Sequence, residues 1–265
     1  MTSQGERREE SKTETIAIIN ERGGVGKTTT AAALGSGLAL RGHKVLFVDM
    51  DASATLSYGL GVADSFFSEL GGDIKDFITG KETPEACLIG DGKNWDIIPG
   101  SAELSSFTPD GEGAVYLLKE RLAAFSGKYD YVIIDTPPVL GYLTILALTA
   151  ADSVIIPAKA EAYSLQGIGR LAQTLDAVRK NSNPAIKVRG ILITMLKGNT
   201  KLARYMVEQF QATAAAMETT LYRSHIRETV THAEAALFQR TLFEYAPTSP
   251  AADDYNAFID EFLAQ

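Results

Sequence analysis

The amino-acid sequence predicts an α/β fold, a single domain built on a mostly parallel twisted sheet with helices on both faces. Three observations support this prediction. Short apolar runs typical of buried strands alternate with longer segments of helical periodicity. The strand runs are apolar throughout, as expected of strands that are covered on both faces. No turn of the kind that joins antiparallel hairpins separates them.

Length and composition fit one such domain. The chain has 265 residues, of which 45% are hydrophobic and 22% are charged, so wholesale disorder is excluded. Cys87 is the single cysteine, which excludes a disulfide framework and CxxC metal sites. No apolar run is long enough to span a bilayer, and residues 1–15 are too polar for a signal peptide, so we expect a cytoplasmic protein.

The charge distribution separates a tail from the domain. Residues 1–14 carry mixed charge with no apolar period, which predicts a disordered arm, and residues 15–265 then form the folded domain. The formal net charge is −8, which argues against indiscriminate nucleic-acid binding but leaves room for a local basic face.

A glycine-rich turn follows the first predicted strand. Residues 16–19 form an apolar run, and the turn 23–26 leads into a helix that opens at Lys27. In this strand–turn–helix order, backbone N–H groups point into one concavity at the positive end of a helix dipole, where a polyphosphate fits. Glycine is needed because a Cβ would hold the phosphate away from the backbone. The sequence therefore predicts a phosphate-binding loop (P-loop), whose nucleotide contacts are Gly23, Gly24, Val25, Gly26, Lys27, Thr28 and Thr29.

Two residues at the start of the helix have distinct expected roles. Lys27 can reach the β- and γ-phosphates, and the Thr28 hydroxyl can ligate Mg²⁺. The usual P-loop pattern has glycine where this chain has Glu21, so the loop is atypical. The alternative is a turn that only packs a helix on a sheet, and Gly-Lys-Thr at the helix start argues against it.

Two further strands are predicted to end in aspartate. Residues 44–49 form a buried strand that delivers Asp49 and Asp51, and residues 129–135 form an apolar strand that ends at Asp135. Ligands of open α/β sheets bind at the carboxyl ends of the strands. Asp135, followed by Pro-Pro, has the Walker B form, in which a carboxylate beside the P-loop helps to hold Mg²⁺ and complements Thr28. Solvated aspartates after a strand are the alternative.

The remaining elements complete the alternation. Residues 58–94 are glycine-rich, and we expect them to be irregular, with short helical stretches at best, and to lie on the surface. Strands are predicted at 95–100, 152–158 and 187–195, and helices at 114–125, at 201–217 and at 251–263. A further long helix is predicted to follow the segment 159–167 and to run to about residue 180.

The P-loop has the form of a known family. Residues 22–29 read Arg-Gly-Gly-Val-Gly-Lys-Thr-Thr. This resembles the deviant Walker A motif of the ParA/MinD family of ATPases, which has lysine at the first position. Asp49-Met50-Asp51 and the strand ending at Asp135 resemble the family's two acidic motifs. The resemblance covers residues 15–264, and it is strongest to the ParA/Soj-type ATPases that partition chromosomes and plasmids.

The resemblance implies an activity and a site. It implies that the chain binds ATP and Mg²⁺, that ATP joins two copies face to face, and that hydrolysis is slow until a partner acts. Asp51 takes the role of orienting the attacking water, and Asp49 lies near the water shell of the metal. Arg22 stands at the signature lysine position, which in the family reaches the nucleotide of the partner subunit, and its guanidinium suits phosphate oxygens.

The resemblance also implies partners. In ParA-type proteins the ATP-bound dimer binds double-stranded DNA nonspecifically, which places it on the nucleoid, and a ParB-like protein stimulates hydrolysis. The cations available near the carboxyl-terminal helices are Lys197, Lys201, Arg204, Arg223, Arg227 and Arg240. Ordinary solvated charges are the alternative, because glutamates are interleaved with them.

Other members of the wider group remain as alternatives. A MinD-like membrane ATPase would need a basic amphipathic terminal helix, whereas residues 253–263 are acidic. A P-loop metabolic ligase would need a further cluster of catalytic side chains, and a ParA relative that positions a protein cargo or serves a mobile element has the same motifs. No Asn-Lys-x-Asp guanine motif occurs, so adenine is the expected base.

Overall fold

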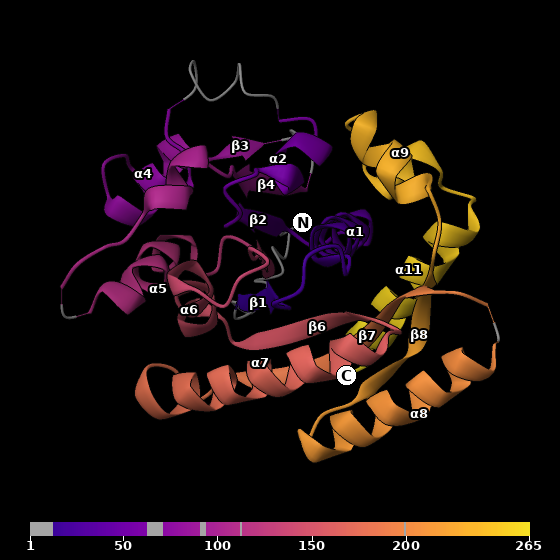
Figure 1. Cartoon of the computed structure of the whole chain (residues 1–265). Coiled ribbons are helices and arrows are strands. Elements are labelled where there is room, and N and C mark those ends of the chain that lie inside the picture. The colour runs from indigo at the N-terminus through magenta and orange to yellow at the C-terminus, as the bar shows by residue number, and fades with distance from the viewer. Residues whose placement is uncertain (1–12, 63–70, 91–93, 112, 199) are drawn as a thin grey trace, which may run out of the picture.

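In the computed structural model of the chain, the described residues are 13–62, 71–90, 94–111, 113–198 and 200–265. Within them one sheet contains the strands β1 (Glu14–Ile18), β2 (Val45–Asp49), β3 (Ile89–Gly90), β4 (Trp95–Ile98), β5 (Tyr131–Asp135), β6 (Ser153–Lys159), β7 (Lys187–Leu196) and β8 (Leu221–Arg227). Their order across the sheet is β3-β4-β2-β5-β1-β6-β7-β8 (Figure 1). Neighbouring strands are parallel except for β3 and β4.

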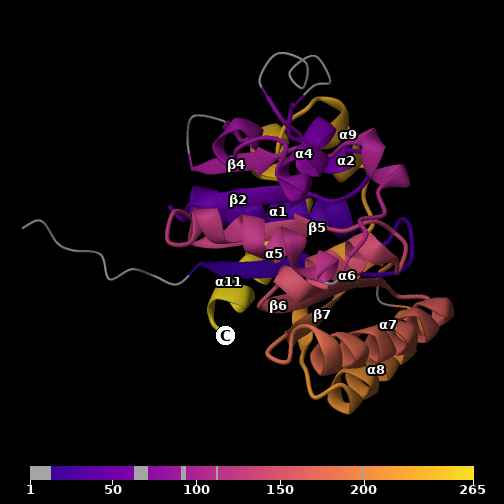
Figure 2. The ribbon, with the colours of Figure 1, turned by 90° about the vertical axis from the view of Figure 1, so that its left-hand side faces the viewer.

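Helices cover both faces of this sheet (Figures 1 and 2). One face carries α1 and α11, and the other carries α4 to α8. The α-helices are α1 (Lys27–Leu40), α2 (Thr55–Gly59), α4 (Ile74–Thr79), α5 (Leu117–Leu122), α6 (Tyr142–Ala150), α7 (Ala162–Asn181), α8 (Lys201–Ala216), α9 (Thr231–Leu237), α10 (Leu242–Tyr245) and α11 (Pro250–Leu263). Short 3₁₀ helices lie at Glu85–Cys87, Ala102–Ser106, Ala114–Tyr116 and Ala123–Phe125.

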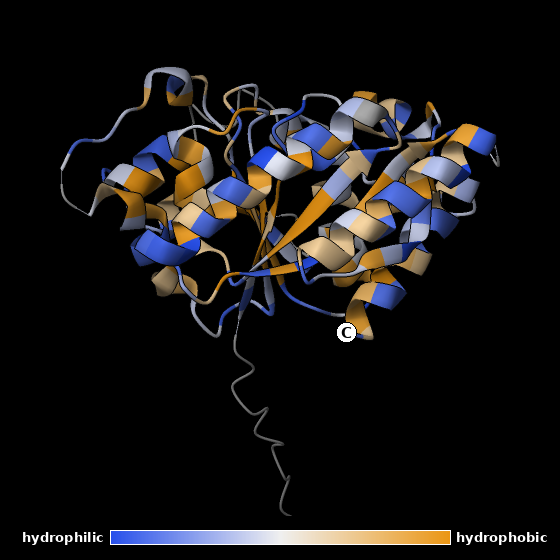
Figure 3. Cartoon of the chain, turned by 60° about the horizontal axis from the view of Figure 1, so that its bottom comes forward, coloured by the Kyte–Doolittle hydropathy of each residue, from blue (hydrophilic) through white to orange (hydrophobic). Residues whose placement is uncertain are grey.

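The core consists of two apolar layers separated by the sheet. All five residues of β2 are buried, and Figure 3 shows apolar strands between helices whose polar residues face outward. The layer beneath α1 and α11 includes Phe47 and Phe258, and the opposite layer includes Phe77 and Phe210. The predicted α/β fold, with a mostly parallel sheet covered on both faces, is confirmed.

The strand order brings the predicted site residues together. β1 lies between β5 and β6, and β5 lies between β1 and β2, so the carboxyl ends of β1, β5 and β2 are neighbours. In the parallel register, Ile18 pairs with Asp135, and Asp135 pairs with Asp49. Residues that are far apart in the chain therefore meet at the edge where the P-loop leaves β1.

One prediction about the middle of the chain was wrong. We expected residues 58–94 to be irregular, with short helical stretches at best, and to lie on the surface. Residues 63–70 and 91–93 lie outside the described residues, but α4 packs into the core through Ile74, Phe77 and Ile78. The i, i+3, i+4 spacing of these side chains gives the helix one apolar face. Asp73 caps its first turn by accepting from the N–H groups of Lys75 and Asp76 at 2.8 and 3.0 Å.

The two ends of the domain are tied to the sheet. The predicted arm over residues 1–14 lies mostly outside the described residues, and Glu14 begins β1. At the other end, α11 buries its apolar face, including Tyr255, Phe258 and Phe262, against the sheet and α1. Across the described ranges, no helix combines the length and apolarity needed to cross a membrane.

Candidate functional site

The P-loop forms a tight concave turn between β1 and α1. Gly24 and Gly26 have φ values of 70° and 85°, in the left-handed region that side chains with a Cβ rarely adopt. Val25 is buried, and its carbonyl oxygen accepts a 2.8 Å hydrogen bond from the Thr194 hydroxyl at the end of β7. The loop is thus anchored from below by β7, a contact that the sequence analysis did not identify.

Lys27 lies across this turn. Its side chain is buried, and Nζ donates a 3.1 Å hydrogen bond to the carbonyl oxygen of Arg22. Burial lowers the pKa of Lys27, while the nearby carboxylates of Asp135 and Asp51 oppose that shift. The ammonium group therefore sits between the loop and two acidic side chains, where it can meet phosphate oxygens.

Asp135 provides the clearest sign of a cation site. The residue is fully buried, and neither carboxylate oxygen has a hydrogen bond of good geometry within the described part of the chain. Burial and then the neighbouring Asp49 raise the pKa of Asp135 well above its usual range, while the nearby Thr28 side chain and Lys27 lower it. A buried carboxylate without partners is costly unless a cation compensates it. The donor set of carboxylate and Thr28 hydroxyl oxygens suits Mg²⁺.

Asp49, by contrast, already has partners. Oδ1 accepts from the backbone N–H of Asp51 at 3.1 Å, and Oδ2 accepts from the N–H and hydroxyl of Ser57 at 2.9 and 2.7 Å. Burial raises the pKa of Asp49 to about 6, although the bonds from Ser57 and Asp51 oppose the shift. The side chain therefore shapes the segment after β2, and its predicted place in the metal's water shell stays a prediction.

Asp51 lies two residues further on, in a tight turn. Its Oδ1 accepts from both the backbone N–H and the hydroxyl of Ser53, each at 2.9 Å. The structure thus brings the predicted residues Lys27, Thr28, Asp51 and Asp135 to one edge of the sheet, and it adds Ser53 and Ser57 to their surroundings.

The residues that open the P-loop are attached to the start of α7. The Arg22 guanidinium forms a 2.8 Å ion pair with Glu161 and lies 3.5 Å from the Ser164 hydroxyl. Glu161 also pairs with Lys159 at 2.7 Å. Glu21, in the atypical position, pairs with Arg170, which approaches both of its carboxylate oxygens. Sequence reasoning missed these partners, because α7 lies more than a hundred residues away in the chain.

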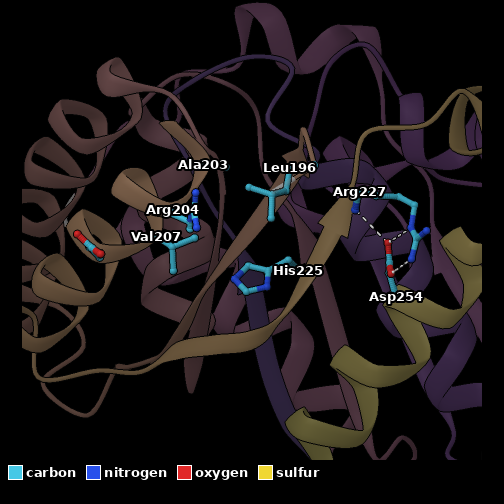
Figure 4. Close-up of a pocket in the computed structure, with 9 residues that line it drawn as sticks. Leu196, Ala203, Arg204, Val207, His225, Arg227 and Asp254 are labelled. Atoms are coloured by element: carbon cyan, nitrogen blue, oxygen red, sulfur yellow. Dashed lines mark hydrogen bonds and ion pairs between the residues drawn. The ribbon is translucent and has the colours of Figure 1, made fainter. Parts of the chain in front are cut away.

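The predicted DNA-binding cations do not form one cluster. Arg227 binds Asp254 through its backbone N–H and guanidinium, and Lys197 pairs with Glu228 at 3.2 Å. A cavity of about 620 Å³ lies between α8 and β8, and Arg204 and Arg227 line it together with His225, Leu196 and Asp254 (Figure 4). The remaining predicted cations are exposed at separate places: Lys201 at the start of α8, Arg223 on β8, and Arg240 beside the cavity between α1, α2 and α9.

Comparisons with known proteins agree with this geometry. A family model described as an AAA domain matches residues 13–188. The chain is 36% identical to the chromosome-partitioning ATPase Soj of Thermus thermophilus over 255 residues, which is 96% of this chain and 97% of that protein.

Solved structures give the same result at the level of the fold. The structure of cobyrinic acid a,c-diamide synthase from Mycobacterium smegmatis, with an ATP analog and magnesium, superposes with a TM-score of 0.82 at 30% identity, covering 95% of this chain and 94% of that one. A putative plasmid partition protein from Borrelia burgdorferi bound to AMPPNP gives a TM-score of 0.75 at 26% identity, covering 96% and 99%.

The family model covers well over half of the chain, and the Thermus relative matches nearly all of it. The P-loop, the buried Asp135 and the strand order described above agree with these matches. The chain is therefore a P-loop ATPase that belongs to the ParA/Soj family of partitioning ATPases.

Proposed function

We propose that this ATPase partitions or positions DNA by cycling between an ATP-bound dimer and a released state. The observation that carries the proposal is the meeting of Lys27, Thr28, Asp51 and Asp135 at one sheet edge. The 36% identity to a chromosome-partitioning ATPase along nearly the whole chain supports it. ATP is the substrate, and Mg²⁺ is the cofactor.

Each residue of the site has a separate role in ATP hydrolysis. Lys27 and the loop backbone bind and neutralise the phosphates. Thr28 and Asp135 would hold Mg²⁺, which would supply further positive charge to the triphosphate. Asp51 accepts a hydrogen bond from the attacking water, whose oxygen bonds to the γ-phosphorus as the bond to the β–γ bridging oxygen breaks. The products are ADP and phosphate.

Arg22 is the residue that we assign to the junction between subunits. Its side chain is 38% exposed beside the P-loop, and its guanidinium carries a charge suited to phosphate oxygens. Val139 and Tyr163, which are 64% and 73% exposed, lie in the segments after β5 and β6 and provide apolar surface on the same side. We propose that two ATP-bound copies meet there, and that a ParB-like partner stimulates hydrolysis in the dimer.

The experiment that tests this function is binding to random-sequence duplex DNA. Binding is measured at low and moderate salt with ATP, with ADP and without nucleotide. We expect binding only with ATP and a steep loss with salt, because release of counterions from the phosphates drives nonspecific binding. Asp51→Ala should bind ATP and remain in the dimeric, DNA-bound state. A DNA affinity that is independent of nucleotide would contradict the proposed cycle.

A small-molecule ligase is the second candidate, because the cobyrinic acid a,c-diamide synthase superposes with a TM-score of 0.82. The two functions separate in the same experiment. A chain that binds ATP but no DNA in any nucleotide state would favour the ligase or a relative that positions a protein cargo. The predicted adenine specificity is tested alongside, since GTP should not support DNA binding.

A further inference from the structure

The segment after β2 contains a pair of hydroxyls connected to Asp51. Ser53 Oγ lies 2.9 Å from Asp51 Oδ1 and 2.9 Å from Thr55 Oγ1. We propose that Ser53, supported by Thr55, is a positioning residue that fixes the carboxylate of Asp51 for hydrolysis. The inference rests on the proposed role of Asp51, and it assigns to Ser53 and Thr55 a function that the P-loop motifs do not include.

The donor in each of these hydrogen bonds follows from the protons that the three side chains carry. An ionised carboxylate only accepts hydrogen bonds, and a hydroxyl carries a single proton. The Ser53 hydroxyl therefore donates to Asp51, and its oxygen accepts the proton of the Thr55 hydroxyl. The bonds run from Thr55 to Ser53 to Asp51.

These bonds make the two oxygens of Asp51 different. Oδ1 already accepts the N–H and the hydroxyl of Ser53, whereas Oδ2 accepts no hydrogen bond from the described residues. Because Oδ1 is occupied from two directions, the carboxylate cannot rotate without losing both bonds. Oδ2 is thus the oxygen left for the attacking water, and its orientation is set before ATP arrives. Preorganisation of this kind lowers the cost of reaching the transition state.

The backbone holds the same turn from below. The N–H of Ala54 donates to the Asp51 carbonyl oxygen at 3.0 Å, and Ala54 has a φ of 49°, in the left-handed region. Gly100 packs directly against this turn: a Cβ there would lie 2.9 Å from the Asp51 carbonyl oxygen and 3.0 Å from Ala54 Cα. The turn is therefore fixed by contacts that do not depend on the Ser53 hydroxyl, so replacing this exposed side chain leaves the turn in place.

Single-turnover hydrolysis of ATP with Mg²⁺ by the full chain tests the proposal. Ser53→Ala should lower the hydrolysis rate about tenfold, the size expected for one hydrogen bond to a charged group. The affinity for ATP should stay at the wild-type value, because Ser53 acts only when water attacks. Ser53→Thr should restore most of the rate because it keeps the hydroxyl. Thr55→Val should also lower the hydrolysis rate, and Thr55→Ser should restore it.

The matched control is Ser105→Ala, which removes an exposed serine hydroxyl that donates to the backbone carbonyl of Ala102 and not to Asp51; it should hydrolyse at the wild-type rate. In an Asp51→Ala background, Ser53→Ala should have no further effect. An unchanged rate in Ser53→Ala, or an equal loss with and without Asp51, would overturn the proposal. If Asp51→Ala itself hydrolyses normally, both the role of Asp51 and this inference fail, whereas the DNA-binding test remains separate.

Discussion

Asp135 and Asp49 are neighbours in the sheet, but their carboxylates differ in hydrogen bonding. Both are fully buried, but Asp49 accepts hydrogen bonds on both oxygens, whereas Asp135 has none of good geometry among the described residues. An unpartnered buried carboxylate destabilises the nucleotide-free protein, and a partnered one stabilises it.

We predict that Asp135→Asn raises the stability of the nucleotide-free chain by about 1–2 kcal/mol, or a few degrees in Tm. It should also abolish the extra stabilisation that Mg²⁺ adds in the presence of ATP. Thermal unfolding without nucleotide measures the first effect, and thermal unfolding with ATP in Mg²⁺ and in EDTA measures the second. Asp49→Asn is the matched control and should lower the stability. A destabilised Asp135→Asn chain would mean that the carboxylate is satisfied within the fold.

Individual residues of the site were predictable where a short motif dictates the chemistry. Lys27 and Thr28 follow from the loop, and Asp135 follows from an apolar strand that ends in aspartate. Ser53 and Glu161 were not predictable, because a serine hydroxyl or an isolated glutamate has no chemical signature until folding supplies its partner. Thr194 was missed for the same reason, since its contact with Val25 joins β7 to a loop 169 residues away.

At the scale of elements, the exposed edge of the sheet is closed by α11. β8 is the last strand, so one side of its backbone has no neighbouring strand. Glu261 accepts from the N–H groups of Arg223 and Ser224 at 2.8 and 3.0 Å, and Asp254 accepts from the N–H of Arg227 at 3.0 Å. These carboxylates occupy donors that would otherwise offer an edge for pairing with another chain.

The hydrogen bonds that Glu261 accepts from β8 predict a pH-dependent contribution to stability. Burial raises the pKa of Glu261, but the hydrogen bonds from Arg223 and Ser224 outweigh it and hold the pKa below its usual value. A lowered pKa in the folded state means that the contribution is present at neutral pH and is lost as the pH falls through the folded-state pKa. Glu261→Gln should therefore destabilise the chain by about 1 kcal/mol at neutral pH.

The difference between wild type and Glu261→Gln should shrink as the pH falls below the usual glutamate pKa of about 4.3 and through the lower folded-state pKa of Glu261. Urea unfolding across this range measures it. Glu120→Gln, which changes an exposed glutamate of α5, is the control and should match the wild type at each pH. A Glu261→Gln deficit that is independent of pH would show that the hydrogen bonds do not depend on the charge.

Elements were easiest to predict where periodicity is long. The strands at the sheet centre and the helices α7, α8 and α11 follow from apolar runs and a helical period. The bounds and the burial of the six-residue α4 were not predicted, although Asp73 before it and Gly80 after it are typical helix boundaries, because a glycine-rich neighbourhood obscured its short apolar face. β8 was not predicted, since its buried positions do not alternate regularly and the carboxylates that engage its free backbone edge lie in α11.

At the scale of the whole molecule, the parallel topology places all strand ends that carry site residues on one edge. Lys201 and Arg204 lie in the first turns of α8, which follows the carboxyl end of β7, so they share this edge with the P-loop. Both are exposed, whereas Arg227 and Lys197 are engaged by carboxylates. We therefore expect Lys201 and Arg204 to supply more of the proposed DNA contact than their paired neighbours.

Removing both charges tests this assignment. The Lys201→Gln, Arg204→Gln double variant should bind random duplex DNA more weakly with ATP. The negative slope of log K against log salt should become shallower by about 2, since each neutralised phosphate contributes about 0.9 to its magnitude. Fluorescence anisotropy over a salt series measures the slope. The matched control, Lys180→Gln with Lys187→Gln, removes the same charge from the opposite end of the sheet, where β7 begins, and should keep the wild-type slope. If the two double variants lose affinity equally, overall charge governs binding, and the edge beside the P-loop is not the DNA-binding face.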